Sequence, residues 1–148
     1  MIVSPLSLIE FFLPGDPKPK LRARASAGNK VKGTKKRRIR MKTPVKTKIE
    51  QARLYTIMRK VAPEVPHLGP VRLSLGYTMP LPKSYSRKLH GGPHVKKPDI
   101  DNLVKLTMDA MTNAGFWVDD TQVVYLLATK RYQREAEAAG CWVTVEEL

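Results

Sequence analysis

Residues 99–115 read DIDNLVKLTMDAMTNAG, and this stretch determines the fold of the second half of the chain. Its apolar residues recur at helical spacing, which predicts an amphipathic helix over about residues 101–114. Gly115 follows directly and is expected to end the helix. Such a helix must pack its apolar face on another element of the fold. The predicted buried face consists of Leu103, Leu106, Ala110, Met111 and Ala114.

The flanking sequence predicts a sheet and a second helix. Apolar runs bounded by turn residues predict strands over residues 6–13, 71–77, 121–132 and 142–145. The second helix is expected to begin near Thr47, where Thr47 and Glu50 resemble a capping box, and to end before Pro63. A flexible loop is expected over residues 80–92.

The basic segment over residues 18–41 is less regular. Weak alternation on both sides of residues 27–29 indicates a hairpin that turns there, and a mobile basic arm is the alternative. The predicted order is strand, basic hairpin or arm, helix, strand, helix, strand, strand. This order is typical of an α/β (mixed α+β) fold, in which a small mixed sheet packs with two main helices. The length of 148 residues fits one domain over residues 1–148.

The charge of the chain is strongly positive and unevenly distributed. The net charge is +14, and residues 18–60 hold 17 Lys and Arg against one acid, Glu50. A domain this basic is attracted to phosphates or to anionic membranes. We expect no membrane partner, because the longest apolar run, residues 6–13, is too short to span a bilayer and lacks the flanks of a signal peptide. The single cysteine, Cys141, excludes an internal disulfide and a cysteine-cluster zinc site, so an intracellular, cytoplasmic protein is expected.

Carboxylates gather in one short part of this basic chain. Five of its six aspartates lie within 22 residues, namely Asp99, Asp101, Asp109, Asp119 and Asp120. Asp99 and Asp101 flank Ile100, and in an extended backbone both would point to one side while Ile100 faces the core. Asp101 also falls at a natural helix N-cap position. Clustered carboxylates repel each other unless a cation neutralises them, so the pattern predicts a divalent-cation site on a surface that binds a polyanion. Hydrolysis of a nucleic-acid backbone uses both.

Four further side chains accompany this pair. Lys105 lies one helical turn after Asp101 and on the same face. Asp119 and Asp120 follow the apolar link over residues 116–118, which is expected to hold them beside the sheet. Asp109 lies one turn beyond Lys105, and an ordinary ion pair between the two is expected. Each aspartate also has an ordinary structural explanation, since this residue type commonly caps helices and forms turns.

The order of these motifs resembles the RusA family of Holliday junction resolvases. The resemblance rests on the runs KPDIDNLVK at residues 97–105, DAM at residues 109–111 and AGFWVDDTQVV at residues 114–124. It extends more loosely to residues 14–20 and 71–77. What the resemblance implies is a small α/β homodimer that cuts four-way DNA junctions by paired symmetric nicks, in DNA recombination and repair. It also implies Mg²⁺ or Mn²⁺ as the cofactor, no small-molecule cofactor, and a bacterial or prophage setting.

The resemblance further implies roles for single residues. Asp99, Asp101 and Asp120 match the family's essential carboxylates, which bind the metal. Lys105 matches its catalytic lysine. Asn102 and Asp119 match supporting positions near the site. The basic segment supplies the candidate DNA contacts, most of them to phosphates. These candidates are Lys18, Lys20, Arg22, Arg24, Lys35, Lys36, Arg37, Arg38 and Arg40.

Alternatives to a junction nuclease remain open from the sequence. The same chemistry could act on flaps, forks or displacement loops, and charge alone does not exclude an RNA target. A non-catalytic basic nucleic-acid-binding protein, whose aspartates only cap helices and form turns, is the alternative from a different functional class.

Overall fold

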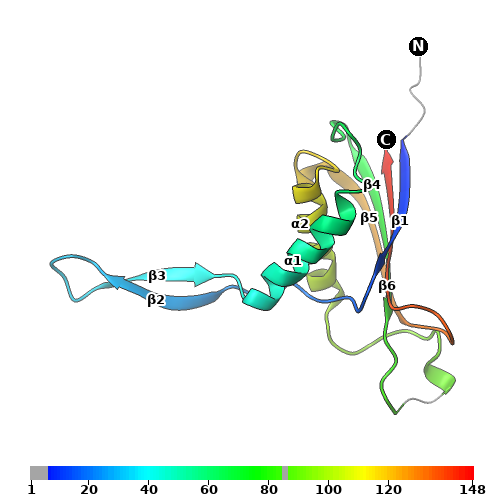
Figure 1. Ribbon diagram of the computed structural model, residues 1–148, viewed down its shortest axis with the longest axis horizontal. Helices are drawn as coiled ribbons and strands as arrows, with labels where there is room; N and C mark the ends of the chain where they lie inside the picture. The colour runs from blue at the N-terminus through cyan, green and yellow to red at the C-terminus, as the bar shows by residue number, and fades with distance from the viewer. Residues whose placement is uncertain (1–6, 85–86) are drawn as a thin grey trace.

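The computed structural model describes residues 7–84 and 87–148. Its main body has two layers, a four-stranded sheet and two helices packed on one face of it (Figure 1). The elements of this body are β1 (Leu8–Pro14), α1 (Val45–Met58), β4 (Val71–Met79), α2 (Ile100–Ala114), β5 (Val123–Tyr132) and β6 (Gly140–Glu147). A separate hairpin of β2 (Arg24–Lys30) and β3 (Arg37–Lys42) follows β1 in the chain. The predicted mixed α+β class and the predicted order of elements are confirmed.

The sheet topology determines where the acidic segments lie. The strand order is β1-β6-β4-β5, and all neighbours are antiparallel except β4 and β5, which are parallel. Parallel neighbours need a crossover, and α2 supplies it. The helix α2 runs back along the two strands. Asp99 and Asp101 at its start therefore lie at one end of this βαβ unit, and Asp119 and Asp120 before β5 lie at the other end.

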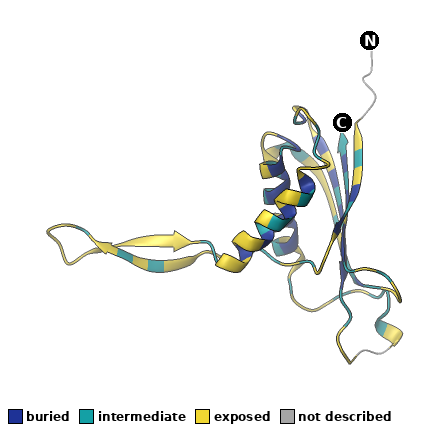
Figure 2. Cartoon of the chain, viewed as in Figure 1, coloured by how far each residue is buried: buried dark blue, intermediate teal, exposed yellow. Residues whose placement is uncertain are grey.

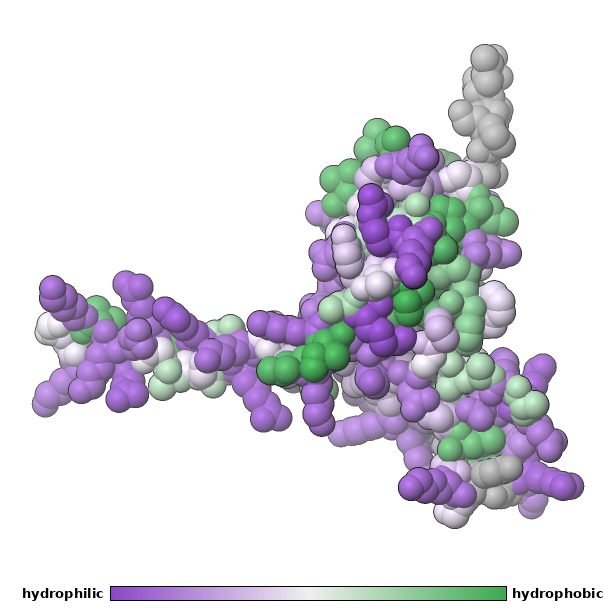
Figure 3. Space-filling view, viewed as in Figure 1, coloured by the Kyte–Doolittle hydropathy of each residue, from purple (hydrophilic) through white to green (hydrophobic). Residues whose placement is uncertain are grey.

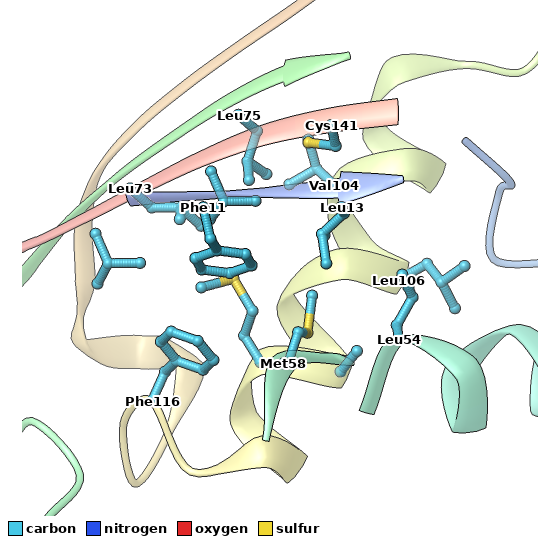
Figure 4. Packing of buried hydrophobic residues seen from close by; sticks show 14 of the residues in the cluster. Phe11, Leu13, Leu54, Met58, Leu73, Leu75, Val104, Leu106, Phe116 and Cys141 are labelled. Carbon is cyan, nitrogen blue, oxygen red and sulfur yellow. The ribbon is translucent and has the colours of Figure 1, made fainter. Parts of the chain in front are cut away.

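The core lies between the sheet and the helices (Figure 4). Strand β4 is the most buried strand and contributes Val71, Leu73 and Leu75 from alternate positions. All five residues predicted for the buried face of α2 are buried. Phe116, in the link after α2, stacks on Phe11 of β1 with ring centroids 5.5 Å apart, so this link is anchored in the core as expected. Fully burying such a side chain contributes about 1.5–3 kcal/mol.

The start of α1 differs from the prediction. The helix begins at Val45, and no side chain caps its N-terminus. Thr47 is buried, and its Oγ1 accepts a hydrogen bond from the backbone N–H of Leu21 at 3.2 Å. Glu50 is also buried and lies 3.7 Å from the ammonium of Lys18. The predicted capping box is therefore wrong, because Thr47 binds the segment that leads into the hairpin and Glu50 accepts hydrogen bonds from Arg53 at 2.6 and 3.1 Å.

The hairpin projects away from the main body (Figure 1), and none of its strand residues is buried (Figure 2). Its turn lies over residues 31–36, so the predicted turn at residues 27–29 is wrong. Gly33 adopts a φ of 80° there, a conformation that glycine reaches without steric cost. Gly28 lies in β2 instead, where a Cβ atom would come within 2.5 Å of the carbonyl oxygen of Arg38. This glycine therefore permits close approach of the two strands rather than a turn.

Several predicted boundaries differ by a few residues. Residues Asp120–Gln122 form a short 3₁₀ helix, η2, so β5 begins at Val123 rather than at residue 121. β6 is longer than the predicted residues 142–145. Leu6 of the first predicted strand and residues 85–86 of the predicted loop lie outside the described residues; the loop also contains a short 3₁₀ helix, η1 (Arg87–Leu89). Among the described residues, no helix is long and apolar enough to cross a membrane.

Candidate active site

Asp99 and Asp101 lie at the start of α2. Asp99 occupies the N-cap position with φ −71° and ψ 142°, and its side chain makes no capping hydrogen bond. Asp101 is in the first helical turn, where the helix dipole favours a negative charge. Ile100 is already helical and is 37% exposed. The predictions that Asp101 caps the helix and that Ile100 faces the core were wrong, because the helix begins one residue earlier than expected.

A cleft of about 470 Å³ lies between α2 and β5. Asp101, Lys105 and Asp109 line it from successive turns of α2, and Asp120 lines it from η2. The prediction that Asp101 and Lys105 share one helix face is thereby confirmed. The apolar part of the lining comes from Ile100, Val104, Met108, Leu126 and Ala128. An apolar wall lowers the local dielectric constant and strengthens the interaction of these charges with a charged ligand.

Two further depressions adjoin this cleft around the start of α2. One shares Asp101 with the cleft and also contains Asp99 and Lys130. The other shares Asp99 with that depression and adds Asn102 and Arg22. The carboxylates are therefore accessible from the basic segment that leads into the hairpin.

Gln122 holds the turn that carries Asp119 and Asp120. Its Oε1 accepts hydrogen bonds from the backbone N–H groups of Val118 at 2.9 Å and of Asp119 at 3.0 Å. Its Nε2 donates to two backbone carbonyls in residues 67–69, at 2.9 and 3.0 Å. All four hydrogen-bonding positions of the amide are used, so the turn is fixed to the loop before β4.

Asp119 and Asp120 have different surroundings. The Oδ1 atom of Asp119 accepts a hydrogen bond from the backbone N–H of Thr121 at 2.8 Å. This bond stabilises the charged form and holds the pKa of the Asp119 carboxyl below its usual value. Asp119 therefore caps η2 and supports the turn, whereas Asp120 lines the cleft.

Asp109 forms its ion pair with Lys20, not with Lys105 as predicted. Lys20 approaches from the segment between β1 and β2, and its backbone N–H donates to the carbonyl of Asn102 at 2.9 Å. Helical spacing alone could not reveal this contact, because the partner comes from a distant part of the sequence. Lys105 makes no ion pair within the described part of the chain and lines the cleft.

The carboxylates are spread along the cleft rather than gathered at one point. Asp101 and Asp109 are two helical turns apart, which is about 12 Å along the axis of α2. Within residues 7–84 and 87–148, no three His, Cys, Asp or Glu side chains lie close enough together to hold a metal ion. Mg²⁺ commonly takes only one or two protein carboxylates and completes its shell with water and substrate phosphates. The oxygen donors of Asp99, Asp101 and Asp120 suit that ion chemically, and their assignment as its ligands stays a prediction.

Comparison with known proteins identifies the family. The family described as Endodeoxyribonuclease RusA matches residues 14–145. The chain belongs to this family. It is 30% identical over 138 residues to the Bacillus subtilis (strain 168) protein described as uncharacterized protein YqaN, which covers 88% of this chain and 92% of that protein. It is 56% identical over 32 residues to the crossover junction endodeoxyribonucleases RusA of Enterobacteria phage 82 and of Escherichia coli (strain K12); each match covers 22% of this chain and 27% of the relative.

Two residues that support the site of this RusA-family chain were given no role from the sequence. Lys130 of β5 donates from Nζ to the carbonyl oxygens of Lys96 at 2.8 Å and Pro98 at 2.6 Å. These bonds hold the segment directly before Asp99 against β5. No periodicity or motif indicated Lys130, because the contact joins two segments that are distant in sequence. Gln122 was also given no role, although it stands in the run AGFWVDDTQVV that carries the family resemblance.

The predicted DNA contacts fall into two groups. Lys18 and Lys20 are paired within the chain, with Glu50 and Asp109, and Arg22 lines the depression that contains Asp99. The other candidates are on the hairpin, in β2, in β3 or in the turn between them, and are Arg24, Lys35, Lys36, Arg37, Arg38 and Arg40.

The hairpin has two chemically different faces. Its register places Arg24 opposite Lys42 and Ser26 opposite Arg40 on one face, and Ala25 opposite Met41 and Ala27 opposite Ile39 on the other. Hydrophilic side chains cover most of the hairpin in Figure 3. The basic face suits contact with a phosphate backbone, and the hairpin reaches well beyond the main body that carries the cleft.

Proposed function

We propose that this chain is a metal-dependent endodeoxyribonuclease that resolves four-way DNA junctions by paired symmetric nicks, in DNA recombination and repair. The observation that carries the proposal is the cleft shared by Asp101, Lys105 and Asp120 in a RusA-family chain with a net charge of +14. The relatives from phage 82 and Escherichia coli, named crossover junction endodeoxyribonucleases, support the choice of substrate. An acidic cleft on a basic molecule suits a cation bound beside a polyanion.

The proposed cofactor is Mg²⁺ or Mn²⁺, with Asp99, Asp101 and Asp120 as its candidate ligands, of which a single ion would take one or two. When bound, the ion supplies a water of lowered pKa and neutralises charge on the scissile phosphate. The chain's own residues would orient the DNA phosphate and stabilise the charge that develops on it. Lys105 lines the cleft with no ion-pair partner among the described residues, and in this proposal it would neutralise charge that develops on the phosphate or on the leaving oxygen. Asn102 lines the depression that contains Asp99, and in this proposal it would hydrogen-bond a neighbouring phosphate.

The basic face of the hairpin and Arg22 would bind the phosphates of the junction arms. Arg22 lines a depression together with Asp99, so DNA held by this segment lies next to the carboxylates. Contacts of this kind fix the position of the DNA and give binding a steep salt dependence. Lys18 and Lys20 each form an ion pair within the chain, with Glu50 and Asp109. Their proposed role is therefore to hold this segment in place as well as to attract DNA.

A homodimer in the cytoplasm of a bacterial or prophage-carrying cell is part of this proposal. Paired nicks in a four-way junction need two sites, and a two-fold dimer presents two identical sites to strands related by the two-fold symmetry of the junction.

The proposal is tested by nicking of a synthetic mobile four-way junction with and without Mg²⁺. Wild type should cut the junction only with the metal, and should cut a flap and a plain duplex far more slowly. Asp101→Asn should bind the junction but should cut it at least on the order of 10²-fold more slowly than wild type. Asp16→Asn is the matched control, because Asp16 is exposed and is the one aspartate outside the cluster.

Two results would contradict the proposal. Equal cutting by wild type and Asp101→Asn would remove the catalytic role of the cleft, and equal cutting of junction and flap would replace the substrate. Calorimetric titration with Mn²⁺ in the absence of DNA gives a second readout. Wild type and Asp16→Asn should bind the ion, and Asp101→Asn should bind it more weakly.

A further inference from the structure

The second face of the hairpin carries two large apolar side chains that nothing covers. Ile39 is 76% exposed and Met41 is 64% exposed, both on β3. Their cross-strand partners are Ala27 and Ala25, which are small, so the two larger side chains form a ridge on that face. A two-stranded ribbon with no buried strand residue gains little stability from such a ridge. Adjacent exposed apolar side chains of this kind are typical of a contact surface.

The charges around the ridge favour a polyanion as the partner over a second copy of this basic chain. Residues 24–42 contain nine Lys and Arg and no acid. The alternation of β3 places Arg37 on the same face as Ile39, at the end towards the turn, and Arg38 and Arg40 on the opposite face. The partner must therefore combine a dense negative charge with an apolar surface.

DNA combines these two properties where its bases are not fully stacked. In a continuous duplex the neighbouring bases cover both faces of each base, and the grooves present mainly the polar edges. At a branch point the faces of some bases are open. Proteins that unstack DNA insert apolar side chains such as isoleucine and methionine between bases, and their Lys and Arg contact the adjoining backbone.

Both ends of the hairpin are fixed beside the candidate active site. On the side before β2, Arg22 lines the depression that contains Asp99, and the backbone N–H of Leu21 donates to Oγ1 of Thr47 in α1. On the side after β3, the chain continues directly into α1. The hairpin itself projects outward from this place (Figure 1). DNA bound at the carboxylates is therefore within reach of the ridge.

We propose that the ridge of Ile39 and Met41 packs against the open base faces at a DNA branch point, and that this contact makes the chain prefer branched DNA to continuous duplex. The basic face of the hairpin holds the phosphates of an adjoining arm. This inference rests on the proposed function for the choice of DNA as the polymer, and it adds the residues that select the shape of that DNA. The catalytic carboxylates take no part in the contact, so it can be measured without cutting.

The first test compares binding to a four-way junction and to a duplex of the same length, without metal, by fluorescence anisotropy. Wild type should bind the junction more tightly than the duplex. Ile39→Ser with Met41→Ser should bind the junction about 10- to 100-fold more weakly than wild type, because the burial of two apolar side chains is lost. Its affinity for the duplex should equal that of wild type, because phosphate contacts supply that affinity.

Two control variants separate the apolar contact from other effects. Ile39→Leu with Met41→Leu keeps the face apolar and should keep the preference for the junction. Leu8→Ser with Val65→Ser changes two side chains of the main body that are 58% and 71% exposed, and should bind both DNAs as wild type does. Thermal unfolding should be the same for wild type and for the serine variant of the hairpin, because the changed side chains are exposed.

The second test detects the contact at the bases. A junction that carries a fluorescent adenine analogue at its branch point should change its fluorescence when wild type binds. The change should be much smaller when the serine variant of the hairpin binds at a saturating concentration. The same analogue in the middle of an arm should respond to neither protein.

The outcomes separate this inference from the nuclease proposal. Equal binding of junction and duplex by wild type overturns the inference, and so does a serine variant that keeps the preference for the junction. A serine variant that loses affinity for both DNAs by the same factor also overturns it. If the serine variant loses the preference and wild type cuts no DNA with Mg²⁺, the contact is supported and the nuclease is rejected.

Discussion

The ammonium of Lys130 donates a hydrogen bond to the carbonyl oxygen of Pro98 at 2.6 Å. This bond joins β5 to the segment directly before Asp99, so the two parts of the chain that line the site are held together. Lys130 therefore acts on the site by positioning the backbone, and its role can be separated from that of a residue that contacts DNA.

Replacement of Lys130 by methionine is expected to lower the rate of cutting by about 10–100-fold, the usual effect of losing a group that orients a metal ligand. The apparent affinity for the junction should change little, so the loss should appear in kcat rather than in KM. Lys130→Arg keeps the donors and should recover part of the rate. Lys48→Met, on an exposed position of α1, is the control. A rate equal to that of wild type in Lys130→Met would show that the bonds to Lys96 and Pro98 do not position Asp99.

Gln122→Ala is expected to destabilise the protein as well as lower its activity. The variant removes the partly buried hydrogen bonds to the carbonyls of His67 and Gly69 and the exposed ones from Val118 and Asp119, and a typical hydrogen bond contributes about 0.5–1.5 kcal/mol. Thermal unfolding measures the stability, and junction cutting at a temperature where the variant is folded measures the effect on the turn. Gln122→Glu keeps the acceptor but sets a carboxylate oxygen against the carbonyls of His67 and Gly69, so it should not recover the loss. The control variant is Gln51→Ala in α1. Equal losses of stability and activity in Gln51→Ala and Gln122→Ala would show that the turn does not depend on the Gln122 amide.

The two faces of the hairpin are expected to contribute differently to DNA binding. Arg38→Ala together with Arg40→Ala removes two cations, so the slope of log K against log salt should become shallower by about 0.9 for each phosphate that the protein no longer binds. Ile39→Ser changes the opposite face and should leave the slope unchanged. Fluorescence anisotropy of a labelled junction at several salt concentrations gives the slope. An unchanged slope in the double variant would mean that the hairpin does not contact phosphates.

The pair between Arg131 and Glu137 is expected to give stability that depends on pH. The guanidinium of Arg131 hydrogen-bonds the carboxylate and lowers the pKa of Glu137 to about 2. A carboxyl group with a lowered pKa in the folded state stabilises the protein above its ordinary pKa, and this contribution is lost as the pH falls towards about 2. Both side chains are partly exposed, so the contribution is about 1 kcal/mol or less.

Glu137→Gln should therefore lower the melting temperature by a few degrees at pH 7, and its difference from wild type should shrink as the pH is lowered through the range from 4.5 to about 2. Glu135→Gln, a change at an exposed neighbouring position, should have no such effect at any pH. A difference between Glu137→Gln and wild type that stays constant down to pH 2 would contradict the lowered pKa.

The parts of the fold that were predicted correctly depend on short-range patterns. The apolar residues of α2 repeat every three to four positions, and Gly115 ends the helix with a φ of 89°. The predicted buried face of this helix is confirmed because any sheet placed against it would bury the same side chains. The wrong predictions concern residues with more than one possible partner. Thr47 and Glu50 have the spacing of a capping box, but Thr47 bonds the segment before the hairpin and Glu50 pairs with Arg53 instead.

The candidate site likewise has some features that short-range patterns predict and others that depend on distant partners. The composition and order of its residues were apparent from the sequence, and so was the shared helix face of Asp101 and Lys105. The ion pair of Asp109 with Lys20 and the bonds of Lys130 to the segment before Asp99 were not. These contacts join parts of the chain that no local spacing relates, so their partners depend on how the segments pack.

The sequence by itself determined the class of fold, the position and inward face of α2, the basic character of the hairpin and the motifs that place the chain in its family. Tertiary structure decided which carboxylates share the cleft, which lysines are already paired and which residues of the hairpin lie opposite each other. The physical reason is the range of the interactions. Helical and strand periodicity act between neighbours in sequence, whereas the cleft exists only after the crossover through α2 has placed β5 beside β4.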